Sequence, residues 1–150
     1  MTIQTEKEAG RKPNPAQRHF PTVARVLLGL LFFTAGSTGL LMSLHLMPPP
    51  PDNLPPGAAA FSGALAKTGY MMQLSSGTDF IVGVLLLFNR FVPLALALIA
   101  PVIVNIVAFH LFLAPSGIGP GLVAATLEVY LAWVYRKAFL PMLATRTSPV

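Results

Sequence analysis

The sequence predicts an all-α integral membrane protein, a four-helix transmembrane bundle with a short interfacial helix before the second span. Composition is the first reason: 54% of the 150 residues are hydrophobic and only 10% are charged, whereas about 25% of a typical soluble domain is charged. The second reason is that the apolar residues form runs near the roughly 20 residues that a helix needs to cross a bilayer. These observations argue against a soluble globular enzyme and against a disordered chain.

Four apolar segments are candidate spans, at residues 22–47, 70–88, 92–113 and 121–140. The only charge in the first is Arg25, which lies close to one end, where its side chain can snorkel to the surface. The second is weaker because it contains Asp79, and Pro101 should kink the third. We therefore expect four spans within one membrane domain, residues 22–143.

The connectors are rich in helix-breaking residues. Residues 47–57 are proline-rich and are expected to be extended. The small-residue segment 58–69 is expected to form a short amphipathic helix at the interface; the alternative is an extension of the second span. Residues 89–91 make a tight turn, so the second and third spans should be antiparallel neighbours, and residues 114–121 form another turn.

Basic residues indicate the orientation. The first connector carries only Lys67 against Asp52, and the third connector carries no charge. The other side carries Lys7, Arg11, Lys12, Arg18, Arg25, Arg90, Arg136, Lys137 and Arg146. By the positive-inside rule, both chain ends are then cytoplasmic, with residues 1–21 a disordered basic tail and residues 144–150 a second tail. This topology accounts for the net charge of +5 without a nucleic-acid partner.

Polar side chains inside the spans are the candidate functional residues. Ionisable groups in a membrane cost about 2.5–3.5 kcal/mol each on insertion scales, so Asp79 and Glu128 should face the bundle, where they are candidate catalytic residues. At a rise of about 1.5 Å per residue, both carboxyls and Asn105 lie roughly 10–14 Å from the outer boundary. We expect a small polar cavity near that side, lined by Asn105, His110 and Ser37. The alternative is that these groups only hydrogen-bond neighbouring helices.

Composition also restricts metal chemistry. The chain has no cysteine, which excludes thiolate metal sites and iron–sulfur clusters. The remaining candidate ligands lack the close spacing of a zinc site, so no metal is expected. Axial haem ligation by His45 and His110, at the outer ends of two spans, is a minor alternative.

Several segments resemble the DoxX family of small four-span bacterial membrane proteins. They are ARVLLGLLFFTAG at 24–36, NRFVPLAL at 89–96 and PVIVNIVAFHLFL at 101–113, and the likeness extends over about residues 22–143. The resemblance implies a location in the bacterial inner membrane. Asp79 stands where such proteins often carry Glu, and Asn105, His110 and Glu128 match polar positions typical of the family. Members also carry an Asn-Lys pair on the first span, where this chain has Ser37 and the threonine after it.

The resemblance implies a subunit of, or accessory to, a quinone-linked membrane redox system. Asp79 or Glu128 would exchange protons with the quinone, and His110 or Asn105 would hydrogen-bond its carbonyl oxygen. Electrons would come from a bound flavin, a quinone or a redox partner protein, because the chain has no electron-carrying centre of its own. The alternative is a non-enzymatic scaffold, assembly factor or carrier of a lipophilic ligand. A small transporter is a third class and would require a homo-oligomer, so whether the chain is an enzyme stays open.

Overall fold

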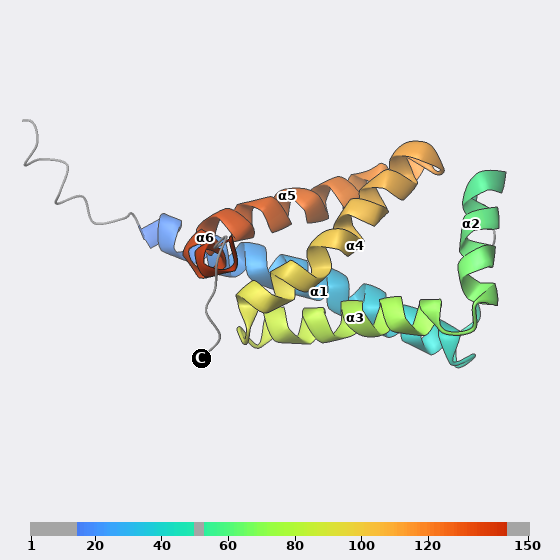
Figure 1. Ribbon diagram of the computed structural model, residues 1–150, viewed down its shortest axis with the longest axis horizontal. Helices are drawn as coiled ribbons and strands as arrows, with labels where there is room; N and C mark the ends of the chain where they lie inside the picture. Colours follow the sequence, from blue (N-terminus) through green and yellow to red (C-terminus); the bar gives the residue numbers. More distant parts are fainter. Residues whose placement is uncertain (1–14, 50–52, 144–150) are drawn as a thin grey trace, which may run out of the picture.

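The computed structural model describes residues 15–49 and 53–143 and contains only helices and turns in those ranges. Figure 1 shows the long helices running along one axis and a shorter helix lying across one end. In chain order the elements are α1 (Pro15–Ser43), α2 (Pro56–Lys67), α3 (Met71–Leu87), α4 (Val92–Phe112), the 3₁₀ turn η1 (Pro115–Gly117), α5 (Ile118–Val134), α6 (Arg136–Phe139) and η2 (Leu140–Leu143). The all-α class predicted from the sequence is therefore confirmed.

The four long helices form a closed ring. In the order α1, α3, α4 and α5 each helix contacts the next, and α5 also contacts α1. Within the part of the chain that the structure describes, three segments are helical, long and apolar enough to cross a membrane: His19–Ser43, Val92–Phe112 and Pro115–Val134. The 17 residues of α3 rise only about 25 Å, and α3 reaches the same standard only together with α2, as a pair bent by 94°.

The α2 helix occupies the segment expected to form a short interfacial helix. Pro56 at its first turn suits a helix start, because proline has no N–H to satisfy there. The bend of 94° to α3 replaces the alternative of a straight extension of the second span. Ala58 of α2 is fully buried, and the Phe61 ring packs 5.7 Å from the Phe109 ring of α4. These contacts hold α2 across the end of the ring (Figure 1).

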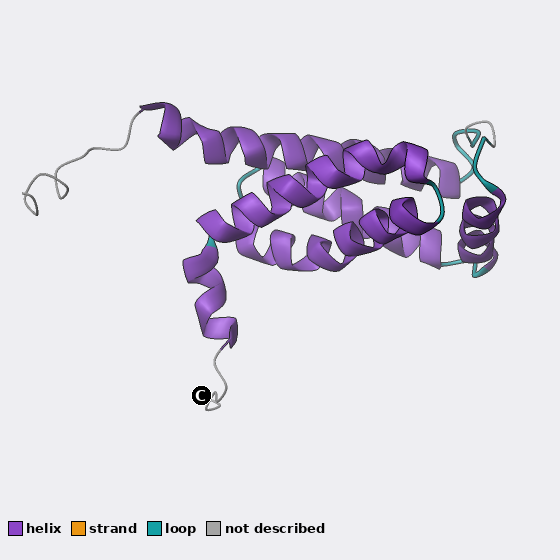
Figure 2. Cartoon of the chain, turned by 90° about the horizontal axis from the view of Figure 1, so that it is seen from above, coloured by secondary structure: helices purple, strands orange, loops and turns teal. Residues whose placement is uncertain are grey.

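Several helix boundaries differ from the predicted ones. α1 begins at Pro15, so the second part of the predicted 1–21 tail is helical, while residues 1–14 lie outside the described residues. The predicted fourth span, 121–140, is divided: α5 ends at Val134 and α6 starts at Arg136. Figure 2 shows this last segment turning aside from the long axis. The predicted C-terminal tail, 144–150, also lies outside the described residues.

The apolar core occupies the half of the ring beside the α3–α4 turn. All four long helices contribute to it, with Leu96 and Ile99 from α4 filling the space between them. Its largest fully buried side chains are Phe32, Leu28, Leu86, Leu96, Ile99, Leu131 and Val82. We call this part of the interior the apolar half, and the part beneath α2 the α2 half.

Glycines allow α1 and α3 to approach backbone to backbone. A Cβ placed on Gly36 would lie 2.7 Å from the Phe80 Cα, and one on Gly83 would lie 2.6 Å from the Phe33 Cα. Real Cβ atoms do not approach other atoms so closely, so larger residues at either position would push the two helices apart. Small residues at helix interfaces of this kind are typical of membrane proteins.

Arg25 does not snorkel to the surface, and this sequence-based expectation is wrong. Its side chain is 8% exposed, and Nη1 donates to the backbone oxygens of Leu86 and, at 3.3 Å, Leu87. The last carbonyls of a helix have no partner within the helix and carry its partial negative charge. The guanidinium therefore caps the C-terminus of α3 and ties it to α1.

Candidate functional site

Both candidate catalytic carboxyls lie on helix faces that turn toward the interior of the ring. Asp79 precedes the fully buried Val82 and Leu86 by three and seven positions, which places all three on one face of α3. Glu128 is 7% exposed and lies three positions before the buried Leu131 on α5. One oxygen of each carboxyl, Asp79 Oδ1 and Glu128 Oε2, is buried without a hydrogen-bond partner among the described residues.

The two carboxyls do not form a hydrogen-bonded pair. Asp79 precedes Phe80, whose backbone packs against Gly36 in the second half of α1. Glu128 lies two residues before Tyr130, whose ring packs edge-on against Phe20 near the start of α1, with centroids 5.1 Å apart. The two groups thus have their neighbours on different parts of α1.

The three residues predicted to line a common cavity lie apart. Asn105 is exposed on the outer side of α4, so it faces away from the ring interior. His110 is half-buried at the α4–α5 turn, where its Nδ1 lies 3.1 Å from the Ala114 carbonyl oxygen. The Ser37 hydroxyl donates to the Phe33 carbonyl oxygen of its own helix at 2.6 Å. None of the three lines the pocket described next.

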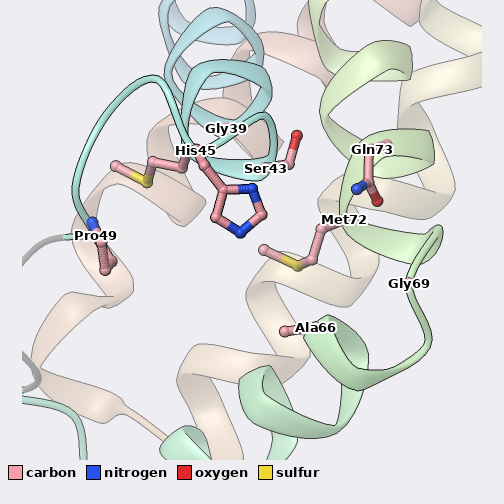
Figure 3. A pocket seen from close by; sticks show the side chains of 9 residues that line it. Gly39, Ser43, His45, Pro49, Ala66, Gly69, Met72 and Gln73 are labelled. Carbon is pink, nitrogen blue, oxygen red and sulfur yellow. The ribbon is translucent and has the colours of Figure 1, made fainter.

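A pocket of about 440 Å³ lies in the α2 half, where α1 ends and α3 begins. Its walls come from the end of α1 and the turn after it, from the end of α2, and from the first turn of α3. Figure 3 shows the His45 ring and the Met72 thioether pointing toward one another across it. The lining residues are Gly39, Met42, Ser43, His45, Pro49, Ala66, Gly69, Met72 and Gln73.

His45 is held at the pocket by the way that α1 ends. The Leu46 N–H donates to the Leu41 oxygen at 2.9 Å and the His45 N–H donates to the Met42 oxygen at 3.0 Å, which is the Schellman pattern of helix termination. His45 occupies the left-handed position of this motif, with φ 59°. Glycine is usual there because a Cβ is unfavourable in that conformation. The imidazole therefore stands at the pocket at some cost in backbone energy.

The equivalent position of α3 gives a useful contrast. There the Arg90 N–H donates to the Leu85 oxygen and the Asn89 N–H to the Leu86 oxygen, so α3 ends in the same motif. Asn89 takes the left-handed position, with φ 55°, and asparagine and histidine both adopt that conformation more often than other non-glycine residues. The two helix ends therefore carry the same backbone motif, and what distinguishes His45 is the pocket that it lines, where a residue in a sparsely populated conformation can serve function.

Sequence reasoning missed most of this pocket. Met42, Ser43, Met72 and Gln73 come from two helices, and only the placement of α2 closes the space between them. His45 carried the one signal in the sequence: a histidine directly after an apolar helix and before a proline run, where glycine would end the helix at lower cost. Among the described residues no group of three His, Asp or Glu side chains is placed to hold a metal ion.

Comparison with known proteins identifies no relative. No protein-family model, no curated protein and no solved structure matches this chain. The geometry of the pocket and of the interior carboxyls therefore carries the functional argument.

Proposed function

We propose that this chain is a four-span, DoxX-like protein of the bacterial inner membrane whose α2-half pocket binds a small amphiphilic molecule. A membrane quinone, within a quinone-linked redox system, is the first candidate ligand. A non-enzymatic membrane scaffold, assembly factor or carrier of a lipophilic ligand is the alternative. The observation that carries the proposal is the imidazole of His45, held in a left-handed backbone conformation beside a cavity of about 440 Å³.

The distribution of charge supports the membrane placement. Arg25 caps the end of α3, Arg90 lies in the turn between α3 and α4, and Arg136 and Lys137 follow the end of α5. These helix ends lie together at one end of the ring (Figure 1). Lys67 is the single basic residue described at the α2 end. Under the positive-inside rule the first end is cytoplasmic. Four crossings then place both chain ends on that side.

The pocket has the composition expected of a site for an amphiphile. Small-molecule sites have volumes of about 300–1,000 Å³ and mostly apolar walls with a few polar groups. Here Met42 and Met72 provide adaptable apolar surface, and Ser43, His45 and Gln73 provide hydrogen-bonding groups. A ring with carbonyl or hydroxyl substituents on an apolar tail would satisfy both kinds of wall.

The interior carboxyls support a role in proton exchange. Asp79 lies seven residues after Met72, about two helical turns farther along α3 from the pocket. Its buried Oδ1 and the Oε2 of Glu128 have no partner among the described residues. Reduction of a quinone takes up protons, and a carboxyl without a fixed partner can hold one. In this proposal Asp79 is the nearer donor and Glu128 the more distant one.

One observation favours the scaffold alternative. Asn105 is exposed near the middle of α4, beside Val104, which is 68% exposed. An amide that faces lipid has no hydrogen-bond partner there, and such side chains commonly pair with a neighbouring helix. A second copy of this chain or another membrane protein would satisfy Asn105 through such a contact.

The decisive experiment replaces His45 with glycine. Full-length wild-type and His45→Gly protein in lipid discs would be titrated with decylubiquinone, and thermal unfolding would be followed in parallel. Glycine relieves the strain of the left-handed conformation. The free energy of unfolding of His45→Gly should therefore be about 0.5–1 kcal/mol higher than that of the wild type. Quinone affinity should fall by about two- to tenfold, since a typical hydrogen bond contributes about 0.5–1.5 kcal/mol net.

Asn89→Gly is the matched control, because it makes the same change in the same motif at the opposite end of the ring. It should leave quinone affinity unchanged. Equal affinity of wild type and His45→Gly would refute the pocket assignment. A wild-type protein that binds no quinone but is isolated as an oligomer sensitive to Asn105→Leu would favour the scaffold.

A further inference from the structure

A second concave surface lies at the opposite end of the molecule, on the outside of the ring. It is a groove of about 430 Å³ where α5 meets α6. Its walls are almost entirely apolar, and Trp133, which is 68% exposed, forms a large part of them. The lining residues are Val129, Ala132, Trp133, Arg136, Phe139 and Leu140. We call this surface the α5–α6 groove.

The groove exists because the chain bends between two helices. α5 ends at Val134, and after Tyr135 the chain continues as α6 and η2 in a new direction (Figure 2). Side chains from the last two turns of α5 form one wall, and Phe139 and Leu140 form the other. A straight continuation of α5 would leave a convex helix surface with no groove.

A cation is fixed at the edge of this groove. The Arg136 guanidinium carbon lies 4.8 Å from the centroid of the Trp133 ring, and its Nη1 donates to the Trp133 carbonyl oxygen at 2.9 Å. Only one of the five guanidinium N–H groups is needed for that bond, so the others can donate to an anion. Lys137 follows directly in the sequence and is exposed.

The charge around the groove is positive. Arg90, on the α3–α4 turn, lies at the same end of the ring. Among the described residues the carboxylates are Asp79 and Glu128, and both face the ring interior. An apolar groove that is lined by one cation, Arg136, and followed in the sequence by a second exposed one, with no exposed carboxylate described nearby, is complementary to a molecule with an acyl chain and an anionic head.

We propose that the α5–α6 groove is a binding site for an anionic phospholipid. An acyl chain lies between Trp133 and Leu140, and the phosphate accepts hydrogen bonds from Arg136 and Lys137. This inference rests on the proposed membrane placement but not on the ligand of the α2-half pocket. The interface between cytoplasm and bilayer is where anionic headgroups attract basic residues close to a span.

The chain contains a built-in reporter for this site, because Trp133 is its only tryptophan. Full-length protein would be reconstituted into phosphatidylcholine vesicles that contain a small fraction of bromine-labelled phosphatidylglycerol or bromine-labelled phosphatidylcholine. Bromine quenches tryptophan fluorescence on contact. We expect stronger quenching by the labelled phosphatidylglycerol at equal mole fraction, with an apparent preference of about fivefold for each cation involved.

Three variants test whether the preference belongs to the groove. Arg136→Gln with Lys137→Gln should reduce it to nearly one, and Ala132→Phe, which fills the groove, should reduce contact with both labelled lipids. Arg90→Gln removes a charge at the same end but outside the groove, and it should preserve the preference. Equal loss in Arg90→Gln would show diffuse attraction to the surface and overturn the site.

The failure of this inference is distinguishable from the failure of the membrane placement. A chain that does not enter the vesicles at all refutes the placement. A chain that enters them but is quenched equally by both lipids in the wild-type form refutes only the site. Loss of the preference on addition of inorganic phosphate at low millimolar concentration would also refute it, because the site would then bind the free anion rather than the lipid.

Discussion

The apolar half and the α2 half of the interior belong to the same ring of helices but differ in the size of the side chains that face inward. In the apolar half, Leu28, Phe32, Leu86, Leu96 and Leu131 are at most 1% exposed, and the core they form is continuous. The α2 half contains a pocket, and its closest helix contacts use residues without bulk. There Gly36 and Gly39 of α1 meet Ser76 of α3.

In the proposed function, the apolar half supplies most of the stability of the ring and the α2 half supplies the binding site. Van der Waals packing holds helices together where lipid offers no hydrophobic driving force, and large buried side chains provide it in the apolar half. The backbones of α1 and α3 approach closely in both halves, at Gly83 as well as at Gly36 and Gly39. At the α2 end fewer large buried side chains fill the space between the helices, and the side chains there line a pocket. The predictions below test this division, in order of decreasing effect.

The two ends of the ring should be accessible from opposite sides of the membrane. The chain has no cysteine, so single cysteines report each end without background. Ser116→Cys, on η1 at the α2 end, and Ala138→Cys, on α6, replace small exposed residues. With a membrane-impermeant maleimide on intact spheroplasts, Ser116→Cys should be labelled and Ala138→Cys should react only after permeabilisation. If both cysteine variants were labelled on intact spheroplasts, the two ends of the ring would not lie on opposite sides of the membrane.

Truncation of a core residue should be far more damaging in the apolar half. Leu86→Ala removes a fully buried side chain of α3 and should lower the free energy of unfolding by about 2–5 kcal/mol. Leu74→Ala makes the same change on the same helix at the α2 end, where the side chain is 60% exposed. It should cost less than about 0.5 kcal/mol. Thermal unfolding in lipid discs measures both, and equal effects would contradict the division.

Neutral replacements of the interior carboxyls should change stability much less than the truncation of Leu86. Asp79→Asn and Glu128→Gln keep the side-chain shape and remove an ionisable group whose buried oxygen has no partner among the described residues. The free energy of unfolding should change by no more than about 1 kcal/mol in either direction. Quinone-dependent turnover, if the redox proposal holds, should be lost in the folded variants. A loss of more than about 3 kcal/mol would show that the carboxylate pairs with a cation.

The apolar half was the more predictable part of the molecule. Continuous apolar runs mark helices directly: α3 and α4 agree with the predicted segments to within one residue at each end, whereas α1 begins seven residues earlier and α5 ends six residues earlier than predicted. The interior placement of Asp79 and Glu128 also follows, because an ionisable group on the lipid side would be unfavourable. Asn105, which is not ionisable, was expected to line the cavity but lies on the outer side of α4. α4 is apolar on all sides, so its sequence has no stripe that fixes the rotation of the helix.

The α2 half was less predictable because its features depend on tertiary arrangement. The segment of α2 could be located from its residues, but its right-angle placement rests on contacts such as that of Phe61 with Phe109. The pocket is a consequence of that placement. The position of the Arg25 side chain was predicted wrongly for a related reason. Its partners are backbone oxygens of α3, and every residue has a backbone carbonyl, so the sequence does not indicate which one Arg25 contacts.

The bond from Arg25 to the end of α3 also bears on the order of events during synthesis. α1 leaves the ribosome well before Leu86 and Leu87 exist, so its guanidinium at first has no carbonyl to cap. In the proposed membrane placement, a charge without that partner is costly inside the bilayer, so α1 alone should stay close enough to the surface for water or headgroups to solvate Arg25. Insertion of α3 then supplies the acceptors. In this placement, α1 reaches its final position only after α3 has been synthesised and inserted.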